Sequence, residues 1–287
     1  MSKHWENAPV AVITGAGSGI GLALVNACLN KQMRVVMADI DEQALTRRVM
    51  QLHMSERDRV LSFPCDVTQL EHVHHLAKES IRVFGRVDWI FNNAGISGRI
   101  APLWMLSPDE IQQVMDVNLY GVLNGIQVFL PILFEQRHRS RIINMASFYG
   151  LCSGSNMTAY AMSKHAIVAL SESLHFELSV SEKPVDVSVV CPSFANTGLL
   201  SNSKPSEESP LHAVMIDLIQ RSRDPEEVAN HVLAEIEKGV FYILPDREVK
   251  DYFEQRMRAI INQTAPHQHN LEKVMQALTR RVVENTH

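Results

Sequence analysis

Short runs of apolar and β-branched residues recur along this chain, and longer segments with apolar residues at helical spacing separate them. The segment after the third run shows the helical spacing at Leu70, Val73, Leu76, Ala77, Ile81 and Phe84. This alternation is typical of parallel strands joined by right-handed crossovers. The runs that predict strands are VAVIT (10–14), RVVMAD (34–39), RVLSFPC (59–65), VDWIFN (87–92), RIINMAS (141–147), VDVSVVCP (185–192) and VFYILP (240–245). They predict a single doubly wound α/β domain over residues 1–245, with a seven-stranded parallel sheet flanked by helices and ligands at the carboxyl ends of the strands.

The residues after the last predicted strand leave this rhythm. DYFEQRMRAIINQ (251–263) and LEKVMQALTRRVV (271–283) both read as helices. The second would carry an apolar face made of Leu271, Val274, Met275, Leu278 and Val282. We therefore expect a C-terminal helical extension, residues 246–287, packed on the domain or on a neighbouring subunit, with a separate binding role as the alternative.

Composition and charge narrow the class of partner. The chain has 287 residues and 46% hydrophobic content, which is ample for a buried core. Its net charge of -5 includes no basic cluster, so the electrostatic footprint of a nucleic-acid-binding protein is missing. A small-molecule partner is favoured, and no nucleic acid is expected.

The termini, cysteines and histidines indicate a cytoplasmic protein without a metal. Residues 8–30 are uncharged, but glycines interrupt them, so a strand and helix fit better than a membrane span. The start MSKHWENAPV lacks a secretory pattern, and the four cysteines form no C-x-x-C pair. The histidine groups HVHH (72–75) and HQH (267–269) lack a metal-ligand framework. We expect no metal, no membrane and a reducing compartment.

A glycine-rich turn follows the first predicted strand in VAVITGAGSGIG. Gly15, Gly19 and Gly21 have the spacing T-G-x-x-x-G-x-G, which differs from the general G-x-G-x-x-G fingerprint. A dinucleotide pyrophosphate needs a turn without Cβ atoms and the free N–H groups of a helix amino end. The turn is thus a candidate dinucleotide site, although a tight strand-to-helix connection alone would give the same pattern.

Asp39 closes the second predicted strand, 18 residues after Gly21. A carboxylate at this distance can accept hydrogen bonds from the adenosine ribose and would repel a 2′-phosphate. Neither Ser18 nor Ile40 has a basic neighbour within the turn, so the sequence favours NAD over NADP. A strand-end capping role for Asp39 stays open, and the arginines at 34, 47 and 48 keep NADP open.

The stretch TAYAMSKHAI (158–167) places Tyr160 and Lys164 one helical turn apart on the same face. A phenol titrates near pH ~10, and a neighbouring ammonium lowers that pKa toward a useful range for proton transfer. Ser147 ends a buried strand thirteen residues earlier and offers a hydroxyl to the same substrate oxygen. Asn118 falls within a predicted helix, either as a core amide or as part of a proton relay.

Taken together, these motifs resemble the short-chain dehydrogenase/reductase superfamily, whose fold is Rossmann-type. The resemblance runs from residue 9 to about 200 in family order. It rests on Thr14 to Gly21, Asp39, CDVT around Asp66, NNAG at Asn92 to Gly95, Asn118, Ser147 and Tyr160-x-x-x-Lys164.

The resemblance implies a role for each matching position. Tyr160 would be the general acid/base, Ser147 would stabilise the reacting oxygen, and Lys164 would lower the tyrosine pKa and bind the nicotinamide ribose. Asn118 would hold a water through its main-chain carbonyl. The implied cofactor-binding residues are Gly15, Ser18, Gly19, Ile20, Gly21, Asp39, Ile40, Asp66, Val67, Asn93, Ala94, Gly95, Tyr160, Lys164, Pro192, Phe194 and Thr197.

The loops after the fourth, fifth and sixth strands would form the substrate pocket, in which Arg99 is a possible anchor for an anionic group. The candidates are Ser97, Phe148, Tyr149, Met157 and Leu199. Residues 198–224 are polar and resemble the substrate lid of this family. Ser193 stands where the family commonly has glycine and would be strained if that position needs φ > 0. Cys152 lacks an activating histidine and is expected to be inert.

The leading hypothesis is an NAD(H)-dependent oxidoreductase that interconverts a medium-sized hydrophobic secondary alcohol and its ketone. One alternative is an NADPH-dependent carbonyl reductase. Another is a catalytically silent dinucleotide-sensing or scaffold protein. By resemblance, the chain is expected to form a homodimer or homotetramer.

Overall fold

The computed structural model describes residues 7–197, 199, 215–216, 219–270, 272–274, 276–277 and 280. Its centre is a seven-stranded, all-parallel sheet with the strand order β3-β2-β1-β4-β5-β6-β7. The strands are β1 Val10–Thr14, β2 Arg34–Asp39, β3 Val60–Pro64, β4 Trp89–Asn92, β5 Ser140–Met145, β6 Val185–Val190 and β7 Tyr242–Ile243. The predicted doubly wound α/β fold is confirmed, and the strand order reverses between β1 and β4, where such sheets bind ligands.

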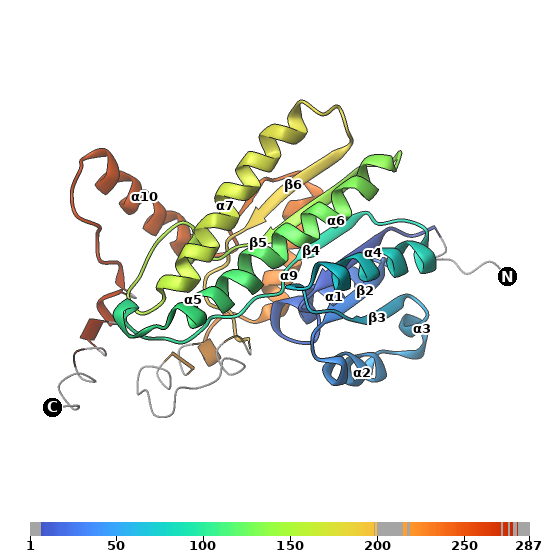
Figure 1. The fold of residues 1–287 in the computed structure, drawn as a ribbon, viewed down its shortest axis with the longest axis horizontal. Helices are drawn as coiled ribbons and strands as arrows, with labels where there is room; N and C mark the ends of the chain where they lie inside the picture. The colour runs from blue at the N-terminus through green and yellow to red at the C-terminus, as the bar shows by residue number, and fades with distance from the viewer. Residues whose placement is uncertain are drawn as a thin grey trace.

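Helices cover both faces of the sheet (Figure 1). They are α1 Gly19–Asn30, α2 Glu42–Gln51, α3 Met54–Arg57, α4 Leu70–Phe84, α5 Pro108–Met115, α6 Gly121–Glu135, α7 Thr158–Ser179, α9 Pro225–Glu237 and α10 Arg247–Ile261. Short 3-10 turns lie at η1 Leu103–Met105 and η3 Phe148–Gly150, and a π-helical turn lies at η2 Asp116–Tyr120.

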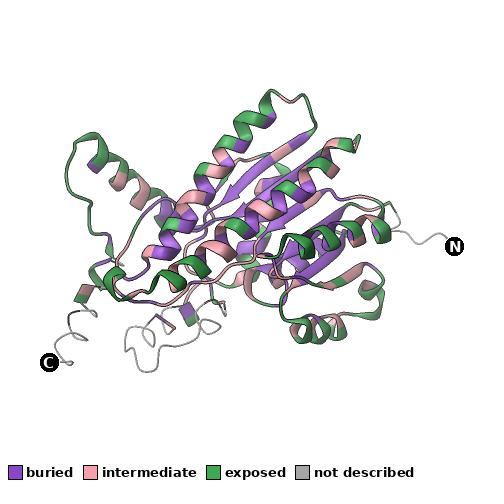
Figure 2. Cartoon of the chain, viewed as in Figure 1, coloured by how far each residue is buried: buried purple, intermediate pink, exposed green. Residues whose placement is uncertain are grey.

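Alternation along β1 divides the core into two layers. Val10 and Val12 pack with α4, α6 and α7, whereas Ala11 and Ile13 pack with α1 and α9. Successive strand side chains point to opposite faces, so a strand buried on both sides is apolar throughout. Figure 2 shows the central strands as the buried centre of the molecule, whereas the edge strand β3 is only partly buried.

Within the described part of the chain, one apolar helical stretch, Pro108–Glu135, meets the length and composition of a membrane span. In the fold this stretch is α5, η2 and α6, and α6 packs against β4, β5 and α4. Nearly half of its most apolar window is buried. It is a core helix, and its hydrophobicity is explained by the sheet that it covers.

The predicted extension begins with α10, which Figure 1 shows on the far side of the domain from the N-terminus. α10 inserts Val249 into the core, with Tyr252 and Phe253 partly buried beside it. The second predicted helix is described only in part: residues 272–274, 276–277 and 280 are helical. Of its predicted apolar face, Val274 is exposed, and the other four positions lie outside the described residues.

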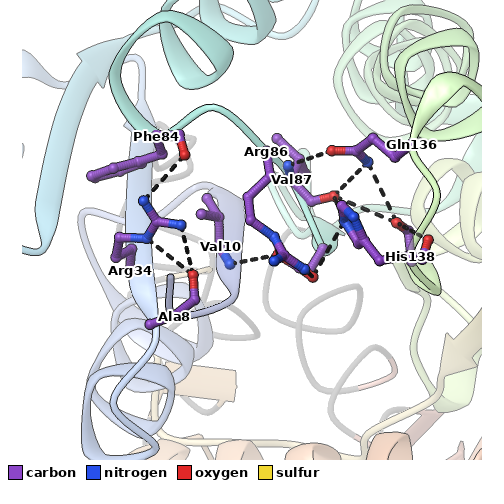
Figure 3. A network of polar contacts seen from close by, with 10 residues as sticks. Ala8, Val10, Arg34, Phe84, Arg86, Val87, Gln136 and His138 are labelled. Carbon is purple, nitrogen blue, oxygen red and sulfur yellow. Dashed lines mark hydrogen bonds and ion pairs between the residues drawn. The ribbon is translucent and has the colours of Figure 1, made fainter. Parts of the chain in front are cut away.

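A buried polar network holds the amino-terminal edge of the sheet, opposite the ligand-binding edge (Figure 3). Asp88 accepts a hydrogen bond of 2.8 Å from the Val10 backbone N–H and pairs with Arg86 through both carboxylate oxygens. His138 lies 3.4 Å from the same carboxylate. At the same edge, Arg34 donates to the carbonyls of Ala8 and Phe84. Asp88 thus joins β1 to the loop before β4.

Replacing Asp88 should test how much this network contributes to stability. Asp88→Ala leaves the buried Val10 N–H without an acceptor and should lower the free energy of unfolding by about 2–4 kcal/mol. Denaturant unfolding would measure the change, and the kinetic constants should stay near those of the unmodified chain. Glu79→Ala, which breaks an exposed pair with Arg82, is the control and should change stability far less. Equal losses for both variants would contradict the prediction.

Candidate active site

A cavity of about 450 Å³ opens at the carboxyl ends of the strands. Its wall includes, for each of β1 to β6, the last residue of the strand or a residue within two positions after it. Every residue that the resemblance assigned to the cofactor lines it, as do Ser147, Tyr149, Met157 and Leu199. Positions from residue 15 to residue 199 therefore meet in one place, because all strands of a parallel sheet end at the same edge.

The glycine turn leaves no space for side chains on the cavity floor. Gly15 and Gly19 have φ values of +65° and +54°, in the left-handed region. A Cβ atom on Gly21 would lie 2.0 Å from the Gly15 carbonyl oxygen. Ser18 precedes α1 without capping it through its side chain, and the first residues of α1, Gly19 to Gly21, line the cavity. The first N–H groups of a helix have no partner within the helix and can bind an anion. The turn fits a dinucleotide pyrophosphate, which needs this close approach of the backbone.

Asp39 lines the cavity and also stabilises the turn. Its carboxylate accepts hydrogen bonds of 2.8 Å from the Gly17 N–H and 3.0 Å from the Asp41 N–H. The capping interpretation and the ribose-binding interpretation are therefore compatible. Of the arginines that kept NADP open, Arg34 lies at the opposite edge of the sheet, while Arg48 donates to the Gly17 carbonyl at 3.2 Å.

A threonine that the sequence patterns left without a role fixes the ends of β1 and β4. The Thr14 hydroxyl accepts from the backbone N–H groups of Asn93 and Ala94 and donates to the Phe91 carbonyl. The Asn93 side-chain amide donates to the Thr14 carbonyl at 2.8 Å. The sequence marked Thr14 only as the first residue of the T-G-x-x-x-G-x-G motif. A hydroxyl at a strand end can bridge two neighbouring chain segments, which is the signal that could have identified this role.

Tyr160 extends from the first turn of α7 toward Ser147 at the end of β5. Burial raises the pKa of Tyr160 to about 12, and a hydrogen bond with the Ser147 hydroxyl opposes this rise. The nitrogen of Lys164 lies 5.6 Å from the Tyr160 ring centroid. Burial is thus the dominant influence on the pKa of this phenol.

Lys164 is a buried cation. Its side chain is 4% exposed, and its nitrogen donates to the Met145 carbonyl at 2.9 Å. Burial lowers the pKa of Lys164 to about 8. A buried ammonium with one hydrogen bond retains two N–H groups for further partners, such as ribose hydroxyls.

Asn118 lies behind the cavity wall, in the π-helical turn between α5 and α6. Its side-chain amide is fully buried, donating to the Ile96 carbonyl and the Ser163 hydroxyl and accepting from the Ile96 N–H at 2.8 Å. A π-turn interrupts regular helical bonding and often marks a functional position. The side chain acts as a core amide that holds the loop after β4.

Other predicted positions have different places in the fold. Phe148 and Ser97 are buried and do not line the cavity, and Arg99 is bonded to Met105 and Glu110 instead of pointing into it. Burial raises the pKa of Cys152 to about 11, as expected of an inert thiol. Cavity residues that the sequence patterns did not assign are Cys65, Gln113, Val117, Met145, Ala146, Ser193, Ala195, Met215 and Ile219.

The turn after β6 tolerates serine. Ser193 does not have a positive φ, and its N–H donates to Asp246 at 2.8 Å. Thr197 lies against Gly19, so the loop after β6 meets the glycine turn. Most of the predicted lid, 198–224, lies outside the described residues, although Met215 and Ile219 line the cavity. Among the residues that the structure describes, no group of three or more potential metal ligands occurs.

A match to a known protein family identifies the kind of protein that carries this site. The family model described as short chain dehydrogenase matches residues 9–208. The chain belongs to the short-chain dehydrogenase family. It is therefore an oxidoreductase that acts on the CH–OH group of an alcohol, or on the corresponding ketone, with a nicotinamide dinucleotide as acceptor.

Other short-chain dehydrogenases are similar over most of the chain. A 1-deoxy-11-beta-hydroxypentalenate dehydrogenase of Streptomyces exfoliatus is 37% identical, covering 66% of this chain and 68% of its own. A 3beta-hydroxysteroid dehydrogenase 2 of Eggerthella lenta is 31% identical over 76% of this chain and 84% of its own. A short-chain dehydrogenase of Burkholderia phymatum, solved in complex with NAD, is 31% identical with a TM-score of 0.86 over 93% of this chain and 99% of its own.

Proposed function

We propose that this short-chain dehydrogenase uses NAD(H) to interconvert a medium-sized hydrophobic secondary alcohol and its ketone, with Tyr160 as general acid/base. The observation that carries the proposal is the shared cavity. Ser147, Tyr160 and Lys164 line the same space as the glycine turn and Asp39. Proton-transfer groups beside a dinucleotide site are what hydride transfer to or from an alcohol carbon requires.

The roles of the side chains follow from their environment. Ser147 donates a hydrogen bond to the substrate oxygen and orients it toward the Tyr160 hydroxyl. Tyr160 takes the alcohol proton during oxidation and returns it during reduction. Lys164 stabilises the phenolate and binds the nicotinamide ribose, while Asn118 holds the loop after β4. The dinucleotide, when bound, supplies the hydride acceptor or donor.

The cavity wall supports a hydrophobic substrate. Beyond the catalytic residues, the described wall is mainly apolar: Ile96, Val117, Met157, Phe194, Leu199, Met215 and Ile219. Burial of apolar surface would supply most of the affinity, with few polar groups to orient the ligand. Two relatives are named for a hydroxypentalenate and a hydroxysteroid, which supports a hydrophobic alcohol. The first of these alcohols also carries a carboxylate, so the relatives do not indicate the charge of the substrate of this chain.

We further propose that the enzyme works in a reducing, cytoplasmic compartment and forms a homo-oligomer. All four cysteines are free and buried, which is compatible with that compartment. NADP stays the second candidate cofactor, favoured by Arg48 beside the glycine turn.

The proposal predicts turnover with NAD and a charge-dependent cofactor preference. Nicotinamide absorbance should change with NAD and a panel of hydrophobic secondary alcohols, and more slowly with NADP. Asp39→Asn keeps an acceptor for Gly17 but removes the charge that repels a 2′-phosphate. The ratio of kcat/KM for NADP to that for NAD should then rise by about ten- to a hundredfold.

Asp41→Asn is the matched control for this test, because Asp41 is exposed, caps α2 and does not line the cavity. It should leave the cofactor ratio unchanged. An equal shift in both variants would show that Asp39 does not select the cofactor. Silence of the unmodified enzyme across the panel, with both cofactors, would count against the proposed reaction.

A further inference from the structure

Residues 148–157 connect Ser147 to Tyr160 and form part of the substrate wall. Tyr149 and Met157 of this segment line the cavity. We call residues 148–157 the wall segment. Because it spans the two catalytic residues, its position sets both the substrate wall and the approach of Ser147 to Tyr160.

Three residues that follow the last strand bind the wall segment at alternate positions. Arg256 donates to the Leu151 carbonyl at 2.9 Å, His269 contacts the Ser153 carbonyl at 3.3 Å, and Glu272 accepts from the Ser155 N–H at 2.7 Å. All three partners are backbone groups. The C-terminal extension therefore holds the path of the wall segment independently of its side chains.

Glu272 is the most constrained of the three contacts. Its side chain is 9% exposed, and its second oxygen accepts from the Gln276 amide at 2.8 Å. Its own N–H donates to His269 Nδ1, so the Nε2–H of a neutral His269 donates to the Ser153 carbonyl. A buried carboxylate with fixed partners is poorly screened by solvent and exerts its charge on nearby groups.

Tyr149 is the group on which the charge of Glu272 acts. Its hydroxyl is buried without a hydrogen-bond partner among the residues that the structure describes. Burial raises the pKa of Tyr149, and the negative charge of Glu272 raises it further. A methyl group at Gly154 would lie 3.2 Å from both the Tyr149 hydroxyl and a Glu272 oxygen, so the two approach the same point.

We propose that the C-terminal extension helps to form the substrate site through Glu272. This residue positions the wall segment, and its charge makes the site select neutral substrates over carboxylates. The inference rests on the proposed function and adds the charge class of the substrate. Glu272 holds the wall segment through Ser155 and places a negative charge behind the Tyr149 wall.

The charge balance of the cavity supports this selection. Lys164 is the only basic side chain in the described wall, and its nitrogen is bonded to the Met145 carbonyl. Arg256, the cation on the wall segment, is bonded to the Leu151 carbonyl and does not line the cavity. An anionic substrate group near Tyr149 would thus meet the charge of Glu272 with Lys164 as the one basic side chain in the described wall. Like charges in a poorly solvated site repel strongly, whereas a neutral hydroxyl or carbonyl avoids this cost.

The charge is tested with Glu272→Gln, which keeps an acceptor for the Ser155 N–H. The probes are 2-decanone and 9-oxodecanoate, which differ by a terminal methyl or carboxylate, assayed as ketones with NADH. The variant should raise kcat/KM for 9-oxodecanoate relative to 2-decanone by about fivefold to tenfold. Glu254→Gln is the control, since Glu254 is an exposed carboxylate on α10 and should leave the ratio unchanged. A ratio within twofold of the unmodified enzyme in Glu272→Gln would overturn the selection.

The positioning role is tested with Glu272→Ala, which removes the acceptor. KM for 2-decanone should rise about fivefold or more, and Glu272→Gln should restore it. Amide hydrogen exchange across residues 148–157 should quicken in the alanine variant alone. Absence of turnover in the unmodified enzyme would reject the proposed function, while binding of the two ketones to the NADH-loaded protein and the exchange measurement would still test Glu272. Unchanged exchange in Glu272→Ala would overturn the positioning role.

Discussion

Tyr160→Phe is expected to reduce kcat by about 10²–10⁴ while leaving NADH binding within a fewfold of the unmodified enzyme. The substitution removes one oxygen from a ring that packs edge-on against Tyr149, with centroids 5.9 Å apart. The ring contacts therefore persist, and the proton acceptor is lost. A loss confined to kcat is the mark of a group that acts in the transition state.

The pH dependence gives this prediction a sign. Burial raises the pKa of Tyr160 to about 12, so at neutral pH the phenol is protonated. Alcohol oxidation needs the ionised form, and its rate should rise with pH as that form becomes populated. Ketone reduction needs the protonated form and should be flat at neutral pH and fall in the alkaline range. Tyr160→Phe should remove both dependences.

Tyr120→Phe is the matched control, because Tyr120 is about half exposed on η2 and does not line the cavity. Its kcat should match that of the unmodified enzyme. The measurements are steady-state rates by nicotinamide absorbance and NADH affinity by fluorescence. Retention of more than a tenth of the activity in Tyr160→Phe would show that another group transfers the proton.

Local sequence patterns were sufficient to predict the sheet and the glycine turn on the floor of the cavity. The strand at Val10–Thr14 and the turn at Gly15 follow from burial and from the absence of Cβ atoms, which adjacent residues determine. Tyr160 and Lys164 share a helix, so their proximity follows from helical geometry alone. These features involve residues close in the chain.

The positions that sequence reasoning missed depend on contacts between distant segments. The guanidinium of Arg34 bonds to the carbonyls of Ala8 and Phe84, which lie 26 and 50 positions away in the chain. The bond between Glu272 and Ser155 joins residues 117 positions apart. The burial that raises the Tyr160 pKa is likewise a property of the assembled site. No periodicity encodes such pairs.

Lys164→Met should abolish most activity and, at neutral pH, stabilise the fold. Lys164 would stabilise the phenolate and the cofactor ribose, so we expect kcat/KM to fall by about 10² or more. Its burial, however, opposes folding: the pKa of Lys164 falls from its ordinary value of 10.5 to about 8 in the folded protein. A difference of this size corresponds to a cost on the order of 3 kcal/mol, reduced in the variant by the lost bond to Met145.

The sign of the pH dependence follows from proton binding. Below pH ~8 the lysine is protonated in both states, so the folded state carries the full cost of the buried charge. Between pH ~8 and ~10.5 only the unfolded state keeps the proton, so the stability of the lysine form rises and the cost disappears. The melting temperature of Lys164→Met should therefore exceed that of the unmodified protein by several degrees at pH 7, and the difference should shrink at pH 10. Thermal melts at the two pH values would measure it.

Lys183→Met is the matched control for this last experiment. Lys183 also donates to a backbone carbonyl, that of Phe134 at 3.2 Å, and its nitrogen lies 5.7 Å from an aromatic ring centroid, but it is exposed. The corresponding values for Lys164 are 2.9 Å and 5.6 Å, so the two sites differ chiefly in burial. Lys183→Met should change neither activity nor the pH dependence of stability.

A Lys164→Met protein that is less stable than the unmodified chain at pH 7 would show that the buried ammonium is compensated within the fold, since its only cost comes from desolvation. A more stable but inactive variant would show that Lys164 is retained for catalysis at the expense of stability.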